Sequence, residues 1–354
     1  MDRFQDWMSA LDPKDWDPDA LDARLRRRAG APRILAGMGW GTADQLTVHG
    51  HVVEETGPVP GESLAGVLLD LLRGRADTPI SGVLVAARCG GREATTTTGD
   101  DGAFDLRIPG EGLDRRGTHK VTLTLPRYGV ETEVEVRVPR RDARFAILTT
   151  LDGAVLPLRG PDLLQAVGQM VETGAPPPTH FPGVGALLTI LRRDVMAQPR
   201  NPLLYTGAVP ADHRELLHAI LTRQDLPPGP MLLADDDPRT DRVRALRAVL
   251  EAYPDLDVLL IGDQALDADA FLEIAETYPG RVLAAALRGD RPSHPATGRL
   301  AARVDTVLAP DAVAFAEHAR SRGWIRERDL PRIRSARNQD LEAAEERGAL
   351  QGAA

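Results

Sequence analysis

The chain has 354 residues, enough for two domains, because a single hydrophobic core usually stops growing at roughly 250–300 residues. Its hydrophobic share of 42% and charged share of 27% are those of a globular protein, which excludes wholesale disorder. The net charge of −9 excludes a general nucleic-acid-binding protein, which needs clustered lysine and arginine. The one cysteine, Cys89, excludes an internal disulfide and fits a reducing compartment.

The N-terminal sequence Met1–Asp6 lacks the basic and apolar segments of a signal peptide. No stretch reaches the roughly 18 apolar residues that a transmembrane helix needs. We therefore expect a cytoplasmic protein without a transmembrane segment. The basic tract Arg24–Arg28 leaves a peripheral contact with anionic lipid headgroups open. The neighbouring Asp17, Asp19 and Asp22 favour a solvated helix face at the same tract.

The first predicted units are a lead-in and a β domain. Residues 1–44 have the pattern of a helical and extended lead-in. From Gln45 to Val138 apolar residues alternate with polar ones, and Gly, Pro and Asp-Gly turns interrupt the alternation. This pattern predicts strands with one buried face. Residues 45–140 are therefore expected to form a β-sandwich domain that resembles the immunoglobulin or prealbumin type.

From Arg144 onward strands and helices alternate. The expected strands are Phe145–Thr149, Leu203–Thr206, Met231–Ala234, Val258–Ile261, Val282–Ala286 and Val304–Leu308. The expected helices are Asp162–Glu172, Val184–Arg192, Asp212–Arg223, Thr240–Ala252, Ala268–Thr277 and Asp311–Arg322. Continuous apolar strands between amphipathic helices predict a parallel sheet covered by helices on both faces. Residues 141–325 are assigned to this α/β domain, and residues 326–354 to a charged C-terminal helix that frays into a tail.

Several short motifs between Arg33 and Arg288 are shared, in order and spacing, with one protein family. They are Met38-Gly39-Trp40-Gly41-Thr42, Phe181-Pro182-Gly183-Val184, Asn201-Pro202-Leu203-Leu204-Tyr205, Leu226-Pro227-Pro228-Gly229-Pro230, Leu260-Ile261-Gly262-Asp263 and Tyr278-Pro279-Gly280-Arg281-Val282. In these motifs the chain resembles the actin-patch type of phosphatidate phosphatase, a branch of the haloacid-dehalogenase-like superfamily. The resemblance implies a haloacid-dehalogenase-like α/β domain with its active site at the carboxyl edge of the parallel sheet.

The catalytic positions that this resemblance implies depart from the family pattern. The family has a nucleophilic aspartate and a second, acid–base aspartate two residues later. Here the nucleophile position is Thr150, and only the second position keeps its aspartate, Asp152. A threonine hydroxyl is a poor nucleophile without an adjacent base, and it brings no charge to a metal ion.

The phosphate-binding and metal positions are also altered. The resemblance places Gly207 where the family has a serine, with Thr206 one residue early. It places Arg242 where the family has a phosphate-binding lysine, although an ordinary surface arginine remains an alternative there. Asp263 and Asp267 take the metal positions and imply Mg²⁺ as the cofactor. Asp263 also suits the N-cap of the next helix, and Asp235–Asp237 suits a solvated loop and cap.

The leading functional hypothesis is a phosphatidate-phosphatase-like protein that is catalytically impaired and retained for binding, regulation or scaffolding. One alternative is an active Mg²⁺-dependent phosphatase of lipid or small-molecule phosphomonoesters, with a rearranged site around Asp152. Another is an interaction module that acts through the β-sandwich. The implied partners are a phosphorylated lipid or small molecule, or a protein, and not a nucleic acid.

Overall fold

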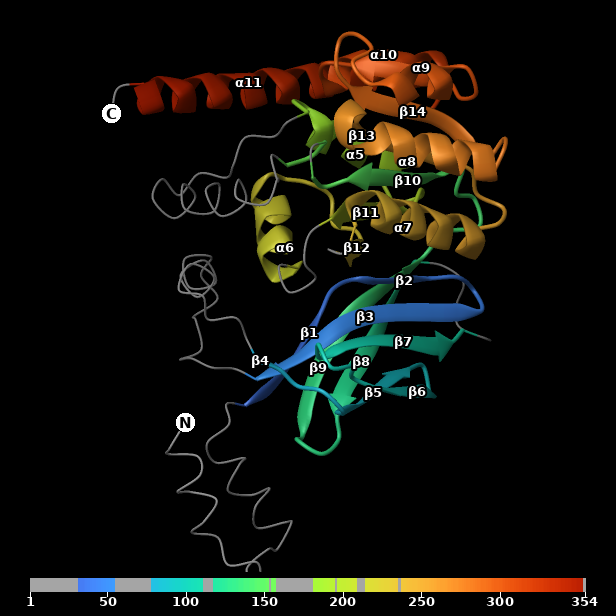
Figure 1. The fold of residues 1–354 in the computed structure, drawn as a ribbon, viewed down its shortest axis with the longest axis vertical. Coiled ribbons are helices and arrows are strands. Elements are labelled where there is room, and N and C mark those ends of the chain that lie inside the picture. Colours follow the sequence, from blue (N-terminus) through green and yellow to red (C-terminus); the bar gives the residue numbers. More distant parts are fainter. Residues whose placement is uncertain are drawn as a thin grey trace, which may run out of the picture.

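The structure is a computed structural model in which the described residues are 31–54, 78–110, 117–152, 154–156, 181–194, 196–208, 214–234 and 237–352. It contains two regions that follow each other along the chain, one built on a β-sheet and one built on a parallel sheet with helices (Figure 1). The predicted helix Asp162–Glu172 and the basic tract Arg24–Arg28 lie outside the described residues.

The N-terminal β region forms one sheet of nine strands. The strands are β1 (Pro32–Ala36), β2 (Gly39–Gly41), β3 (Gln45–Glu54), β4 (Thr78–Pro79), β5 (Leu84–Cys89), β6 (Arg92–Thr97), β7 (Ala103–Pro109), β8 (Gly117–Leu125) and β9 (Val130–Val138). The sheet is mixed, because β2 runs parallel to β9 while the other pairs are antiparallel. Strand β1 pairs along its whole length with β3, so the sheet already begins at Pro32. It therefore includes part of residues 1–44, the segment expected as a lead-in.

Alternating burial confirms the predicted period of two in these strands. Leu106 and Ile108 of β7 are buried while Asp105 and Arg107 between them are exposed. The apolar residues of one face collect in a single core that contains residues of β3, β5, β7, β8 and β9.

The C-terminal α/β region forms a parallel sheet of six strands in the order β12-β11-β10-β13-β14-β15. The strands are β10 (Ala146–Thr150), β11 (Leu203–Ala208), β12 (Met231–Ala234), β13 (Val258–Asp263), β14 (Val282–Arg288) and β15 (Thr306–Ala309). The helices are α5 (Val184–Arg192), α6 (Arg214–Arg223), α7 (Pro238–Ala252), α8 (Gln264–Thr277), α9 (Pro295–Ala301), α10 (Ala312–Ser321) and α11 (Leu330–Gly352), with a short 3₁₀ turn at Glu327–Asp329.

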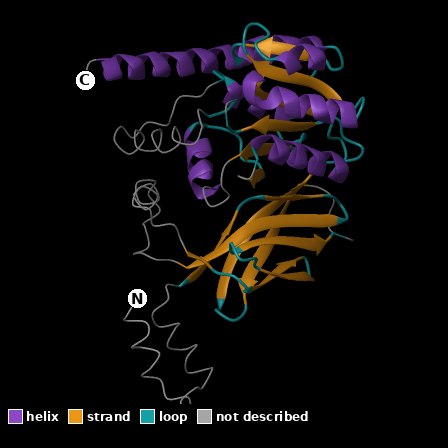
Figure 2. Ribbon diagram, in the orientation of Figure 1, coloured by secondary structure: helices purple, strands orange, loops and turns teal. Residues whose placement is uncertain are grey.

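Helices cover both faces of this sheet, as the apolar strands predicted (Figure 2). One core holds residues of α5, α6, α10 and the start of α11 against one face. The other core holds residues of α7, α8 and α9 against the opposite face. The seven-residue helix α9 was not predicted, and it begins with Pro295 behind the capping side chain of His294. The C-terminal helix begins at Leu330 and projects to one side in Figure 1.

The two regions are joined by an aromatic contact and by arginines. Trp40 of β2 belongs to the core beside α7 and α8, and its ring meets Tyr253 edge-on at a centroid distance of 5.8 Å. Nη1 of Arg137 in β9 donates to the carbonyl of Pro228, which precedes β12.

In the described residues, no helix is both long enough and apolar enough to cross a bilayer.

Candidate active site

The carboxyl ends of the central strands bring most of the predicted site residues together. Because β10, β11 and β13 are parallel, their last residues lie at one edge of the sheet, where Thr150 pairs in register with Thr206. Asp152 follows β10 by two residues, and Gly207 lies so close that a Cβ built on it would be 3.3 Å from Asp152 Oδ1. The sheet therefore brings together four residues that the sequence predicted from two separate motifs.

Arg242 is the centre of this cluster. It lies on α7, and its guanidinium Nη2 donates to Oδ2 of Asp152. Its Nε lies 2.6 Å from Oδ1 of Asp267 on α8. The side chain of Arg242 is only 2% exposed and that of Asp267 is fully buried, so the interpretation of Arg242 as an ordinary surface arginine is wrong. One buried cation is thus shared by two carboxylates.

The second oxygen of Asp267 is also occupied. Thr150 Oγ1 donates to Asp267 Oδ2 at 2.8 Å, and the backbone N–H of Asp263 donates to the same oxygen at 2.6 Å. Burial raises the pKa of Asp267 to about 7; the positive charge of Arg242 opposes this shift and the negative charge of Asp152 adds to it. Asp267 is therefore a buried carboxyl group with a pKa near neutrality that accepts a hydrogen bond from the hydroxyl of Thr150.

Asp263 has a structural role that accounts for both of its oxygens. Its Oδ1 accepts from the backbone N–H of Ala265 and so caps the N-terminus of α8. Its Oδ2 accepts from Nε of Arg288 at 2.9 Å and lies 2.6 Å from Nη2 of the same residue. The expectation that this residue suits a helix cap is confirmed. Asp237 likewise caps α7 by accepting from the N–H of Thr240.

Arg288, which contacts Asp263, was not identified from the sequence. It ends β14, directly beside Asp263 in the parallel register. A charged residue at the carboxyl end of a buried strand is the signal that could have identified it, because parallel neighbours end at the same edge.

Two threonine hydroxyls at this edge are buried without a hydrogen-bond partner among the described residues. They belong to Thr149 and Thr206, which are 0% and 1% exposed. Thr206 lies one residue before the position where the resemblance expects a phosphate-binding serine, and its hydroxyl makes no hydrogen bond to another described group.

The carboxylates at this edge do not fit a Mg²⁺ ion as they stand. Mg²⁺ requires oxygen ligands that are open to it, but Asp152 and Asp267 contact Arg242, and Asp263 contacts Arg288. Within the described part of the chain, there is no group of three or more His, Cys, Asp or Glu side chains that could hold a metal.

Comparison with known proteins finds a family model that is similar to this region. Residues 146–289 match the family described as phosphatidate phosphatase APP1, catalytic domain. No curated protein matches the chain.

Three solved structures show weak similarity. The first is a carbohydrate acetylesterase from Xanthomonas citri, with 11% sequence identity over 79% of this chain and 68% of that one and a TM-score of 0.32. The second is a sialyltransferase from Photobacterium damsela, with 12% identity over 73% of this chain and 43% of that one and a TM-score of 0.22. The third is a flavohemoglobin from Malassezia yamatoensis, with 10% identity over 82% of this chain and 63% of that one and a TM-score of 0.19. These scores carry no inference about fold or function. The family match covers β10 to the end of β14, including the whole cluster around Arg242.

Proposed function

We propose that this chain is a catalytically impaired member of its phosphatase family, retained for binding, regulation or scaffolding. The proposal includes a haloacid-dehalogenase-like α/β domain from about residue 141 onward and a β-sandwich before it. The observation that carries the proposal is the position of Arg242, whose guanidinium lies between Asp152 and Asp267.

A phosphatase of this kind needs a carboxylate nucleophile, a carboxyl acid–base and a divalent cation. Thr150 supplies a neutral hydroxyl at the first of these positions, and that hydroxyl is already hydrogen-bonded to Asp267. Asp152 would serve as the acid–base, but its carboxylate is ion-paired with a buried arginine. Such a pair stabilises the charged form of the carboxylate and opposes the protonation that an acid catalyst requires.

In this proposal Arg242 also takes over the role of the divalent cation. The carboxylates do not fit Mg²⁺ while Arg242 is present, because the guanidinium contacts the oxygens that would coordinate it. We propose that Arg242 supplies from within the chain the positive charge that balances the site. A phosphorylated lipid or small molecule, or a protein, would then be bound without being hydrolysed.

A second candidate is favoured by the contact between Thr150 and Asp267. A hydroxyl that donates to a carboxylate with a pKa near 7 has the arrangement of a nucleophile and its base. The burial of both residues and the ion pair between Asp267 and Arg242 favour the impaired protein over this candidate. If Thr150 were the nucleophile, wild-type turnover would disappear in both Thr150→Val and Asp267→Asn.

The deciding experiment is a phosphatase assay with p-nitrophenyl phosphate and with phosphatidate, each in the presence of Mg²⁺. Wild type and Thr150→Asp are compared with the double variant Thr150→Asp, Arg242→Lys, which restores the family's carboxylate and ammonium. Thr150→Asp with Arg247→Lys is the matched control, since Arg247 lies on the same helix but is 45% exposed.

We expect no turnover by wild type and a gain of turnover in the Thr150→Asp, Arg242→Lys variant that exceeds the gain in the control. Clear wild-type turnover that disappears in Asp152→Asn would overturn the proposal. Calorimetry with millimolar Mg²⁺ gives an independent readout, with binding expected in the Thr150→Asp, Arg242→Lys variant and not in wild type.

A further inference from the structure

A second candidate site, lined by four arginines among apolar residues, lies at the opposite edge of the parallel sheet. It is a pocket of about 90 Å³ between the β region and the α/β region. Its lining includes Leu203 and Pro230, which lie at the starts of β11 and β12, together with the end of β9. Thr150 lies at the carboxyl end of its strand, so in a parallel sheet the pocket and the Thr150 cluster face opposite edges. We call this site the arginine pocket, after its residues Arg137, Arg140, Arg192 and Arg200.

Two of these arginines converge without a close carboxylate. Nη1 of Arg137 and Nη1 of Arg192 donate to the same carbonyl oxygen, that of Pro228, at 2.9 and 3.0 Å. Arg192 is 7% exposed, and Arg137 is 24% exposed at its side chain. Among the described residues, the only carboxylate near Arg137 is Glu135 at 4.0 Å, and Arg192 has no ion pair. Two partly buried cations that share one neutral acceptor repel each other, and an anion between them would remove that repulsion.

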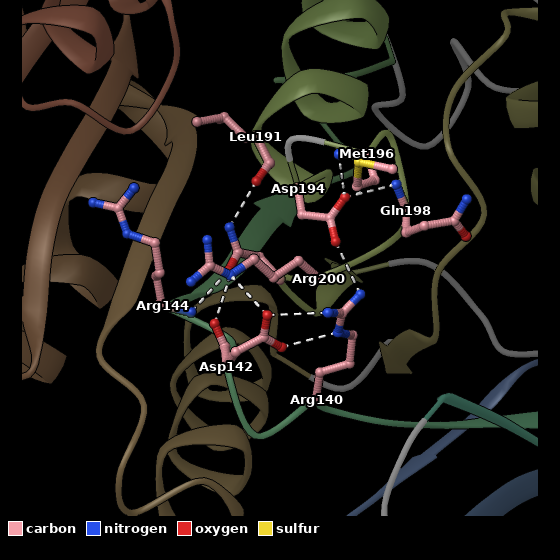
Figure 3. Close-up of polar contacts among 9 residues, drawn as sticks. Arg140, Asp142, Arg144, Leu191, Asp194, Met196, Gln198 and Arg200 are labelled. Atoms are coloured by element: carbon pink, nitrogen blue, oxygen red, sulfur yellow. Dashed lines mark hydrogen bonds and ion pairs between the residues drawn. The ribbon is translucent and has the colours of Figure 1, made fainter.

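The other two arginines are held in place by carboxylates outside the pocket lining. Arg140 makes a two-point contact with Asp142 at 2.9 and 3.0 Å and donates to Asp194 at 3.0 Å. Arg200 donates from Nε to the backbone carbonyl of Asp142, and the same Nε lies 3.7 Å from Oδ2 of the Asp142 carboxylate (Figure 3). Figure 3 shows both guanidinium groups directed toward Asp142. These ion pairs hold the two side chains in the pocket wall and balance two of its charges. The least compensated charges are therefore those of Arg192, which has no ion pair among the described residues, and Arg137, whose nearest carboxylate oxygen is 4.0 Å away.

Two hydrogen-bond donors at this site are buried and unused. Nε of Arg137 and Nε1 of Trp40 have no partner among the described residues, although most buried donors in proteins have one. Burial also lowers the pKa of Arg137. No aspartate or glutamate is among the described residues that line the pocket. The volume is sufficient for several water molecules or one small oxyanion.

We propose that the arginine pocket binds a phosphate group, with Arg137 and Arg192 as its charged ligands. Arginine suits this role because its planar N–H groups match the oxygens of phosphate and pair with them more strongly than neutral donors do. Trp40, Tyr253 and Val138 provide an apolar wall for an organic part of the ligand. Because Arg137 comes from the β region and Arg192 from the α/β region, the bound phosphate holds the two regions together.

The phosphate group can belong to a soluble molecule or to a lipid, and the experiment separates these sources. Isothermal titration calorimetry with inorganic phosphate measures the first, with wild type, Arg137→Gln and Arg192→Gln. Co-sedimentation with vesicles that contain phosphatidate in phosphatidylcholine measures the second, with pure phosphatidylcholine vesicles as the blank. Arg299→Gln is the matched control, because Arg299 is 65% exposed on α9 and outside the pocket.

We expect saturable binding in at least one arm, and a loss of affinity of about tenfold or more in Arg137→Gln and Arg192→Gln but not in Arg299→Gln. Arg137→Lys keeps the positive charge but not the planar set of N–H donors, so it should lose less affinity than Arg137→Gln. Circular dichroism establishes that each variant is folded. The proposal is overturned if wild type binds in neither arm. It is also overturned if folded Arg137→Gln and Arg192→Gln bind like wild type while Thr150→Val does not, since binding would then belong to the other edge of the sheet.

Discussion

Thr150 Oγ1 donates a hydrogen bond of 2.8 Å to Oδ2 of Asp267, a residue that lies 117 positions later in the chain. This contact joins the end of β10 to the first turn of α8 and lies next to the ion pair between Asp267 and Arg242. The Thr150 hydroxyl is therefore part of a buried polar network in which each partner stabilises the next.

Removing this hydroxyl should destabilise the protein. Thr150→Val keeps the shape of the side chain but leaves Asp267 without one of its donors, and we expect a loss of about 1–3 kcal/mol in the free energy of unfolding. Urea unfolding followed by circular dichroism measures the loss. Thr149→Val is the matched control, because the buried Thr149 hydroxyl has no partner among the described residues, and its removal should be neutral or slightly stabilising. Equal losses in the two variants would contradict the network.

The raised pKa of Asp267 predicts a pH dependence of stability. The folded protein holds a proton on Asp267 up to a pH of about 7, whereas the unfolded chain releases it near the ordinary value of 3.8. Between these values the folded state binds more protons, so the free energy of unfolding falls as pH rises, by at most about 1.4 kcal/mol per pH unit, and levels off above 7. Asp267→Asn should remove this contribution and flatten the curve between pH 4 and 7.

The control for the pH series is Asp269→Asn on the same helix, where the side chain is 38% exposed. Thermal or urea unfolding across the pH range should give this variant the wild-type slope. A slope in Asp267→Asn that equals the wild-type slope would show that Asp267 titrates at its ordinary pKa.

Arg242 should contribute strongly to stability. Above pH 7, where Asp267 is ionised, two buried carboxylates lose their shared cation in Arg242→Met, and breaking a buried ion pair on one side costs about 3–5 kcal/mol. Arg247→Met on the exposed face of the same helix should change the free energy of unfolding by about 1 kcal/mol or less. A denaturant titration measures the difference in the free energy of unfolding between the two variants. Similar values for both would mean that the carboxylates do not depend on the guanidinium.

Trp40 should couple the two regions. Its indole is buried in the core beside α7 and packs edge-on against Tyr253, so Trp40→Ala removes apolar contact from both regions. A buried tryptophan replaced by alanine costs about 3–5 kcal/mol, and here we expect the loss to appear as two separate unfolding transitions in scanning calorimetry. Trp40→Phe, which retains an aromatic ring, should stay closer to the wild-type profile. A single, unshifted transition in Trp40→Ala would contradict the coupling.

The order and type of most described elements could be predicted from the sequence because the patterns are local. The helix at Val184–Arg192 and the strand at Met231–Ala234 have the predicted bounds, and the other predicted strands and helices among the described residues differ by a few residues at their ends. Strands with apolar residues on both faces need helices packed on both sides of the sheet, so the helical layers on the two faces could also be predicted from the sequence. The helix α9 was missed because seven residues hold too short a pattern to distinguish from a loop.

The sequence by itself predicted the similarity to the phosphatase family, the parallel sheet and the place of Thr150 and Asp152 at its edge, because the order of motifs and the periodicity of strands can be read directly from the sequence. It did not determine what those side chains contact. That Arg242 is paired with Asp152 and Asp267, and that Arg137 and Arg192 meet at one carbonyl, depends on how α7 lies on the sheet and how the two regions join. These contacts link residues up to 91 positions apart, and only the packing of the folded chain sets their distances.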